Sequence, residues 1–502
     1  MTKKISLLTL MLISAFTSKA ATLSEKIDSF FKPIVENYLV PVIFWDPIKA
    51  MGFDIGASVP IVVVWLVFGA IYFTFRMNFI NIRGFKHAIG LVKGDYDDPN
   101  DKGEVSHFQA LTTALSATVG LGNIAGVAIA ISIGGPGATF WMIVAGLLGM
   151  SAKFVECTLG IKYRKIDENG EVSGGPMYYL RDGLAKYNMA GFGKLLAVLF
   201  AILCIGGSFG GGNMFQANQA YAQLAGQFPA LAGNGPMFGL ILSILVGAVI
   251  IGGIKSIASV TEKIVPFMAA LYVGTALIII LLNFMEIGTV FALIFQGAFA
   301  PAAGLGGIVG VLIQGFRRAA FSNEAGVGSA SIAHAAAKTN EPVSEGFVAL
   351  LEPFIDTVVI CTMTALVLII TGFHNVQGVE GAQMTSQAFG SVFSWFPYLL
   401  VIAIFLFAFS TMISWSYYGL KAWTFLFGRT KLSVYSYKLL FLLFIIIGSS
   451  VKLGAVLDFS DMMILAMAFP NIIGLLILSK EVRIDLDDYY SRLKSGVIKR
   501  FK

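Results

Sequence analysis

The chain has 502 residues, of which 57% are hydrophobic and 13% are charged, and its mean hydropathy is +0.80. This composition excludes a soluble domain with an ordinary polar surface. The net charge of +6 is explained by Lys and Arg in connecting segments that face an anionic leaflet, so it does not indicate nucleic-acid binding. The sequence predicts an all-α protein that crosses a membrane many times.

The first fifty residues differ from the rest of the chain. Residues 1–20 place Lys3 and Lys4 before an apolar run and end in small residues, which is typical of a signal peptide. An uncleaved short anchor is the alternative interpretation. Residues 21–50 have an amphipathic pattern, and we expect them to lie on the periplasmic face of the membrane.

The remaining apolar runs are compared with the roughly 20 residues that cross a bilayer. About eleven spans are predicted, at 57–76, 107–131, 138–161, 195–224, 237–253, 264–284, 306–334, 346–371, 396–420, 437–451 and 462–480. Cys157, Cys204 and Cys361 all fall within spans. They have no metal-binding spacing, so we interpret them as small core residues.

Lys and Arg gather in alternate connections, which predicts the orientation. They are dense in 76–102 and 162–186 and recur in the tail, whereas 225–236 and 285–305 contain none. We therefore expect a periplasmic N-terminus and a cytoplasmic basic tail at 481–502. The predicted location is the inner membrane of a bacterial cell.

Two spans are interrupted by glycine and polar residues. The second reads Gly120-Leu-Gly-Asn-Ile-Ala-Gly126, and the seventh reads Ser322-Asn-Glu-Ala-Gly-Val-Gly328. Unwound backbone survives at membrane depth only where it is buried in protein or lines a polar cavity. Broken helices at corresponding places in two halves indicate an inverted-repeat transporter. We expect repeats at 107–284 and 306–480, preceded by an extra helix at 57–76.

The first break has the chemistry of a binding site. The half-helix that begins near Gly122 offers free N–H groups and a positive dipole end, which suit a carboxylate. The carbonyls of residues 117–119 and the side-chain oxygen of Asn123 suit sodium, a hard cation. The alternative is that the glycines serve close helix packing. The spacing does not match a nucleotide-binding glycine motif.

Three motifs carry a family resemblance: Thr118 to Gly126, Gly210-Gly-Gly-Asn-Met-Phe-Gln-Ala-Asn-Gln219, and Phe321 to Ser329. They resemble the alanine or glycine:cation symporter family, and the Gly174 to Tyr179 loop also fits. The resemblance covers about residues 57–480. It implies the amino acid, polyamine and organocation superfamily fold, a leucine-transporter-like five-plus-five inverted repeat. The first motif is similar to the helix that holds substrate carboxylate and sodium in the bacterial leucine transporter.

The substrate-binding candidates come from the breaks and from two other spans. Span 4 carries several carboxamides that are too costly to leave facing lipid. The alternative role for each carboxamide is polar contact between helices. The resemblance implies that aromatic residues form the walls of the substrate site. The predicted substrate-binding residues are Thr118, Gly120, Gly122, Asn123, Phe215, Gln216, Gln219, Phe321 and Trp415. Trp415 is alternatively an anchor at the membrane interface.

The sodium-binding candidates pair the first break with hydroxyls in span 9. The resemblance implies that adjacent hydroxyls there face carbonyls of the first core helix. The predicted ligands are Thr118, Val119, Asn123, Ser410 and Thr411. The alternative for the hydroxyls is hydrogen bonding to the carbonyl four residues earlier.

Charged residues inside spans usually pair or function. Arg317 and Glu324 either form a structural pair or act in gating. Two further pairs, Lys153 with Glu156 and Glu352 with Asp356, each share a helix face and are interpreted as structural. His107 and His334 lie at the inner ends of the broken helices and His87 and His374 in loops. The sequence places no second ligand near any of them, so no metal site beyond sodium is predicted.

These observations predict a symporter that imports a small neutral amino acid, alanine or glycine, together with sodium by alternating access. The alternative is a proton-coupled amino-acid transporter that uses Glu324 or Glu352 as carrier. The odd-numbered repeat argues against a channel, and an enzyme would need a clustered nucleophile and base. We expect no cofactor, with sodium as the co-transported ion, and the sequence leaves the oligomeric state open.

Overall fold

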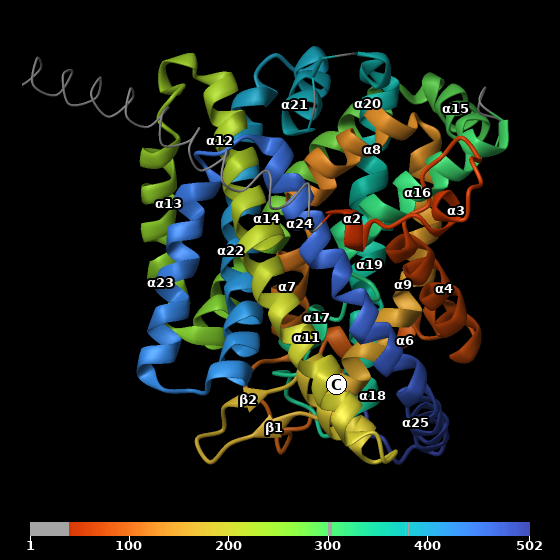
Figure 1. The fold of residues 1–502 in the computed structure, drawn as a ribbon, viewed down its shortest axis with the longest axis vertical. Helices are drawn as coiled ribbons and strands as arrows, with labels where there is room; N and C mark the ends of the chain where they lie inside the picture. The colour runs from red at the N-terminus through yellow and green to blue at the C-terminus, as the bar shows by residue number, and fades with distance from the viewer. Residues whose placement is uncertain (1–39, 300–303, 377, 380, 502) are drawn as a thin grey trace, which may run out of the picture.

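The computed structural model describes residues 40–299, 304–376, 378–379 and 381–501. The predicted signal peptide and residues 21–39 lie outside these ranges. The described chain is an upright bundle of helices (Figure 1). In the part of the chain that the structure describes, strands occur in one hairpin, where β1 (Lys165–Ile166) pairs antiparallel with β2 (Val172–Ser173). This hairpin marks one end of the bundle, which we call the hairpin end.

The first half of the described chain forms long helices joined by short turns. The elements before the second predicted span are α2 (Val40–Ile43), α3 (Pro47–Ala50), α4 (Ile61–Arg76), α5 (Ile80–Arg83) and α6 (Phe85–Val92). The next are α7 (His107–Thr118), η2 (Gly122–Gly126), α8 (Val127–Gly134), α9 (Gly137–Lys162), α10 (Pro176–Tyr178), η3 (Tyr179–Gly183), α11 (Ala190–Phe209), η4 (Gly210–Met214), α12 (Phe215–Gln227), η5 (Pro229–Leu231), α13 (Gly235–Ile250) and α14 (Gly253–Leu282).

The second half of the described chain follows the same pattern. Its elements are η6 (Phe284–Glu286), α15 (Ile287–Phe299), α16 (Gly304–Asn323), α17 (Ala330–His334), α18 (Pro342–Ala349), α19 (Leu351–Pro353), η7 (Phe354–Cys361), α20 (Thr362–Ile370), η8 (Phe373–Asn375), α21 (Gly381–Val392), α22 (Phe396–Phe427), α23 (Lys431–Gly448), α24 (Leu453–Ala466) and α25 (Ala468–Lys494). Residues 285–305, predicted as a connection, contain the apolar helix α15.

Large apolar side chains cover the outside of the bundle. Ile244 on α13, Leu281 on α14 and Leu439 on α23 are each about 60% exposed. Such a surface is unfavourable in water and suits hydrocarbon. Seven described helices are long and apolar enough to span a membrane, or eight if the bent pair α7 and η2–α8 counts as one span. The chain is therefore a multi-pass membrane protein.

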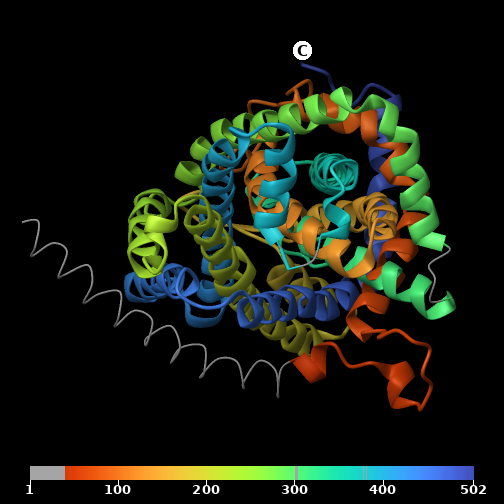
Figure 2. The same cartoon turned by 90° about the horizontal axis from the view of Figure 1, so that it is seen from above.

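Helices occupy all eleven predicted ranges, although some are shorter than a full crossing by the same test. The number of crossings and the inverted repeat remain predictions. The end-on view shows the continuous helix of α19, η7 and α20 inside the bundle rather than on its edge (Figure 2). Four described segments are π-helical, namely η2, η3, η4 and η7, and of these η2 and η4 are wholly buried. Such segments are frequent at functional sites.

Candidate functional site

The first break separates α7 from η2. The helix α7 begins with a capping box, in which Ser106 and Gln109 satisfy each other's backbone N–H groups. It ends at Thr118, and Val119 is extended, with φ −72° and ψ 90°. The helices on either side are bent by 49°. The predicted interruption is therefore present, and it frees backbone groups in the buried interior.

The second break joins α16 to α17. Gly326 and Gly328 have φ of +85° and +97°, where glycine is the residue with least strain. Glu324 also has a left-handed backbone, with φ +55°, which is unfavourable for a side chain of its size. Its carboxylate accepts hydrogen bonds from Ser329 and, at 3.1 Å, from Trp415 Nε1. These contacts hold the strained residue in place.

The two breaks lie against each other. A Cβ added at Gly122 would lie 3.3 Å from the Cα of Ser322, which is tighter than an ordinary van der Waals contact. A larger residue at Gly122 would therefore push the two segments apart. Both residues are fully or almost fully buried.

Asp356 on η7 connects the two breaks. Its carboxylate accepts hydrogen bonds from Asn123 Nδ2 at 2.7 Å and from Ser322 Oγ at 2.8 Å, and Thr357 adds a third at 2.7 Å. It is completely buried, and in the described residues no Lys or Arg forms an ion pair with it. The sequence predicts Asp356 as a structural partner of Glu352. It instead lies between the two breaks, where its oxygens, when ionised, would suit a cation.

Hydroxyls of α22 reach the first break. Thr411 donates to the carbonyl of Ser116 at 2.9 Å, and Ser414 donates to the Ser116 hydroxyl at 3.0 Å. A Cβ added at Gly120 would lie 2.6 Å from Thr411 Oγ1. The hydroxyl of Ser410 instead donates to the carbonyl of Phe407 in its own helix at 3.1 Å. Thr411 therefore faces the break, and Ser414 contacts the last turn of α7 just before it. The Ser410 hydroxyl does not reach the break, but the Ser410 carbonyl accepts from the Ser116 hydroxyl at 2.6 Å.

The other candidate ligands of the first break lie in its immediate surroundings. Asn123 Oδ1 accepts from the backbone N–H of Gly120 at 2.8 Å, which closes the turn. The Thr118 hydroxyl donates back to the carbonyls of Ala114 and Leu115. Val119 is buried at the end of α7. The assignment of sodium to these three residues stays a prediction.

Aromatic side chains surround the glycine-rich segment η4. Phe215 and Phe321 meet edge to face, with ring centroids 5.5 Å apart. A Cβ added at Gly212 would lie 2.3 Å from Trp415 Cγ, so the indole packs directly on the backbone there. All three rings are buried. The predicted aromatic residues thus gather beside the breaks, and Trp415 is not at the membrane interface.

Span 4 has five carboxamides, of which Gln223 donates to Ser386 on α21. The other four divide into two groups. Gln216 Oε1 accepts from the N–H of Leu121 at 3.4 Å, so this side chain touches the first break. Asn213 and Asn218 donate to carbonyls of residues near α23. Gln219 contacts Asn218 and the backbone of α21. Of these four, Gln216 lies at the break, and the other three form hydrogen bonds between neighbouring elements.

The buried charges pair across helices. Arg317 and Arg318 both bind Asp461 on α24, at 2.8 Å for Arg317, and not Glu324. Lys153 binds Glu352 at 3.2 Å rather than Glu156. The same-helix pairs expected from the sequence are therefore replaced by contacts between elements, because packed helices bring oppositely charged groups closer than the i,i+3 spacing does.

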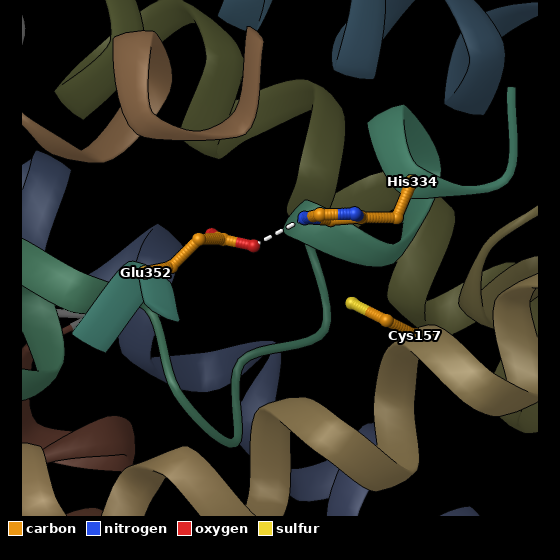
Figure 3. A group of neighbouring side chains, drawn as sticks. All are labelled: Cys157, His334 and Glu352. Atoms are coloured by element: carbon orange, nitrogen blue, oxygen red, sulfur yellow. Dashed lines mark hydrogen bonds and ion pairs between the residues drawn. The ribbon is translucent and has the colours of Figure 1, made fainter. Parts of the chain in front are cut away.

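One group of described residues has the composition of a metal site. Cys157, His334 and Glu352 offer ligand atoms within 4.8 Å of one another, and all three are buried. His334 and Glu352 point toward each other, with the Cys157 sulfur beside them (Figure 3). The sequence predicts no second ligand near any histidine, because Cys157 and His334 lie far apart along the chain.

Comparisons with known proteins identify the family. The sodium:alanine symporter family model matches residues 50–502. This chain belongs to that family. It is 43% identical to the sodium/alanine symporter AgcS of Methanococcus maripaludis, over 84% of this chain and 92% of the relative. It is 38% identical to the probable sodium/glutamine symporter GlnT of Bacillus subtilis, over 87% and 89% of the two chains.

A solved structure is also similar to this chain. It is that of MhsT in complex with L-phenylalanine, with a TM-score of 0.47 and 15% identity, over 75% of this chain and 99% of the other. Membership of the sodium:alanine symporter family makes this chain a sodium-coupled amino-acid symporter, a secondary transporter and not an enzyme. Sodium is its co-transported ion.

Proposed function

We propose that this symporter imports a small neutral amino acid, alanine or glycine, with sodium by alternating access across a bacterial inner membrane. One observation carries the proposal. The two helix breaks lie in contact and share the buried carboxylate of Asp356, which bonds Asn123 and Ser322. A site built from two breaks changes whenever either broken helix moves, and such motion is how access alternates.

The amino acid binds at the breaks. Its carboxylate lies against the N-terminal end of η2, where it takes the place of Gln216 at the N–H of Leu121, as anions bind at helix N-termini. Phe215, Phe321 and Trp415 wall the space for its side chain. The indole of Trp415 packs directly on the backbone of Gly212, and its N–H donates to Glu324, which holds the ring in place. A ring fixed in this way leaves little room for the substrate, so it favours an amino acid with a small side chain. The name of the relative AgcS, a sodium/alanine symporter, agrees with this choice.

Sodium binds at two places beside the substrate. The first lies at the carboxylate of Asp356 and the hydroxyl of Ser322, beside Asn123, whose Nδ2 donates to the same carboxylate. The second lies between Ser116 on α7 and the hydroxyls of Thr411 and Ser414 on α22. Hydroxyl, carbonyl and carboxylate oxygens are the ligands that hard cations prefer. Both places involve the first break, so sodium and the amino acid stabilise the same arrangement.

The orientation follows from Lys and Arg in the connections, which puts the hairpin end of the bundle in the cytoplasm. The N-terminus is then periplasmic, and about eleven spans form the extra helix and two inverted five-helix repeats. Each sodium ion that enters gains about 2.3 kcal/mol per 100 mV of membrane potential. This free energy drives accumulation of the amino acid.

The test is uptake of radiolabelled alanine and glycine into proteoliposomes. We expect uptake with an inward sodium gradient, competition between the two amino acids, and little uptake in potassium. Glutamine serves as the control for substrate size. Uptake driven by a pH gradient in potassium would overturn sodium coupling, and preferred uptake of glutamine would overturn the small-substrate assignment.

A further inference from the structure

Five buried ionisable side chains form a continuous series of contacts near the hairpin end. In order they are His107, Glu345, His334, Glu352 and Lys153. The Glu345 to His334 contact is 2.5 Å and the Glu352 to Lys153 contact is 3.2 Å. Every one of these side chains is at most 4% exposed. We call this series the His–Glu chain. It does not include the substrate and sodium ligands proposed above.

The His–Glu chain joins the two broken helices. His107 is the first residue of α7 and His334 is the last of α17, and Glu345 on α18 contacts both. The same ends are also linked through the backbone, where Val105 and Ala337 form a parallel bridge. The hairpin end of the first broken helix is therefore held against that of the second.

Arg164 strengthens this junction from the end of α9. Its guanidinium donates to the carbonyls of Ala335 and Ala337, and also to those of Lys102 and Thr339. These four carbonyls come from the segments next to α7 and α17. The junction thus consists of a backbone bridge, an arginine and the His–Glu chain.

A count of hydrogens shows what the His–Glu chain requires. Both ring nitrogens of His334 face carboxylate oxygens, Nδ1 toward Glu345 and Nε2 toward Glu352. A neutral imidazole carries one N–H, and an ionised carboxylate carries none. If His334 were neutral and both carboxylates were ionised, its unprotonated ring nitrogen would face a carboxylate oxygen with no hydrogen between them. Two buried acceptors in contact are unfavourable. The observed contacts need one proton more than neutral histidines and ionised carboxylates supply.

Neighbouring groups do not supply this hydrogen. In the part of the chain that the structure describes, Glu345 and Glu352 accept side-chain hydrogen bonds from His107, His334 and Lys153, and from no other side chain. Other titratable groups interact with the His–Glu chain. They are Asp97 and Asp101 near His107, Arg164 near Glu345, Tyr418 near Glu352, Glu156, Glu324 and Asp356 near Lys153, and Cys157 near Glu345, Glu352 and Lys153.

Solvent reaches the outer end of the His–Glu chain through a pocket. The pocket has a volume of about 700 Å³ and is open to the surface. His107 lines it together with Asp101, Glu341 and Arg492. His107 is therefore the member that lies nearest to solvent, and the contacts pass inward from it to Lys153.

A metal ion fits this place less well than a proton. A cation bound to Cys157, His334 and Glu352 would replace the contact drawn between His334 and Glu352 (Figure 3). It would also approach the Lys153 ammonium, which lies 3.2 Å from the other oxygen of Glu352. Repulsion between the two positive charges opposes such binding.

We propose that the His–Glu chain is a binding site for one proton, reached from the pocket at His107, and that the bound proton holds together the hairpin ends of the two broken helices. Loss of the proton leaves two acceptors facing each other at His334, and the junction loosens. The exchange of the proton is therefore coupled to opening at the hairpin end. The consequence for transport rests on the proposed function, but the proton site does not.

The first experiment is hydrogen–deuterium exchange of the full-length protein in lipid nanodiscs, at about pH 6.5 and about pH 8.5, with labelling times matched for intrinsic exchange. A histidine that faces carboxylates keeps its proton above the usual pKa of about 6.5, so the proton should be bound at the lower value and lost at the higher one. Residues 104–112 and 332–340 should exchange roughly tenfold faster at the higher pH, the effect of one charge-assisted hydrogen bond. Residues 240–249 in α13 serve as the reference. Equal protection at both pH values would overturn the proposal.

Glu345→Gln separates a proton site from a purely structural contact. A glutamine donates one hydrogen and accepts another, so it completes the contacts with neutral histidines and needs no extra proton. We expect this variant to keep its protection at both pH values, whereas His334→Gln has low protection at both. His374→Gln, partly exposed at the other end of the bundle, should behave as wild type. A Glu345→Gln variant that follows the wild-type pH dependence would contradict the assignment.

Transport supplies a separate measurement. With equal pH on both sides of proteoliposomes, sodium-driven alanine uptake should rise with pH in the wild type and stay low and flat in Glu345→Gln. An absence of alanine uptake at every pH would overturn the proposed substrate and leave the exchange result to decide the proton site. A rise of equal size in Glu345→Gln would overturn the coupling of the proton to opening.

Discussion

Asn123 donates a hydrogen bond from Nδ2 to the carboxylate of Asp356 at 2.7 Å, and so ties the first helix break to the helix that packs beside the second. The contact joins a residue of η2 to one of η7, two π-helical segments far apart in the sequence. It means that a charge at Asp356 acts on both breaks at once.

Asp356→Asn should raise the sodium concentration needed for half-maximal uptake by tenfold or more, about 1.4 kcal/mol or greater, because the negative charge of the cation site is lost. The variant keeps the shape of the side chain, so its amount in the membrane should be close to wild type. Sodium titration of alanine uptake measures the effect. Asp487→Asn, on the surface of α25, is the control, and an unchanged sodium requirement in Asp356→Asn would remove Asp356 from the cation site.

Thr411→Val and Ser410→Ala distinguish two neighbouring hydroxyls. Thr411 donates to the first break, so its loss should weaken sodium dependence severalfold, the size of one hydrogen bond. Ser410 donates within its own helix, so its loss should have little effect. The same sodium titration compares them. A larger effect at Ser410 would restore the assignment made from the sequence.

Gly212→Ala tests the packing of Trp415. Its added Cβ would lie 2.3 Å from the indole, so Trp415 must move and uptake of alanine should fall at least tenfold. Gly126→Ala is the matched control, because a Cβ there meets nothing within 4 Å, and its uptake should stay near wild type. Competition by larger amino acids measures selectivity. Normal uptake in Gly212→Ala would show that the ring does not limit the site.

Asp461→Asn should destabilise the protein by about 3 to 5 kcal/mol, because two arginines lose their shared buried carboxylate. Thermal unfolding in detergent measures this as a lower Tm. The exposed pair of Arg483 and Asp487 provides the comparison, since its loss costs at most about 1 kcal/mol. Similar Tm values for Asp461→Asn and Asp487→Asn would contradict the structural role of Asp461.

His87 on α6, outside the predicted spans, gives a prediction for acid pH. Burial lowers the pKa of His87 to about 4, whereas a histidine in an unfolded chain has a pKa of about 6.5. The unfolded chain therefore binds the proton first as pH falls. The stability from the neutral His87 is complete above about pH 6.5 and is lost as pH falls toward 4.

The measurement is Tm between about pH 6.5 and about pH 4.5. It should fall less in His87→Gln than in the wild type, and His374→Gln should match the wild type. If Tm fell equally in His87→Gln and in the wild type, His87 would have the same pKa in the folded and the unfolded chain, and the prediction would be wrong. This range lies below the one used for the His–Glu chain, so the two effects are separable.

The sequence allowed the membrane class, the family and both breaks to be predicted, because hydropathy and glycine clusters are local signals. Gly120, Gly122 and Asn123 were found in this way. The sequence places Asp356 in a same-helix pair, since the two partners that belong to the breaks, Asn123 and Ser322, lie more than 30 residues away along the chain. Its presence as an ionisable residue inside a span was the signal that could have identified it.

Contacts between helices were the part that sequence patterns could not supply. The sequence does not identify Asp461 as the partner of Arg317, nor Ser414 as the hydroxyl that contacts Ser116 on α7. Which face of α22 is turned inward depends on its rotation, and a helix with apolar residues on all sides does not reveal this in its sequence. The His–Glu chain was missed for the same reason.

The π-helical segment η4 has a consequence for insertions and deletions. A π turn holds one residue more than an α turn, so everything after it is rotated by about 100° relative to a regular helix. The directions of Phe215 and Gln216 are thus set by a single surplus residue among Gly210–Met214. Deleting one glycine would leave the helix nearly as long and as apolar as before. The deletion would turn the side chains of Phe215 and Gln216 away from the breaks. A relative that lacks one residue within Gly210–Met214 would therefore have a different site.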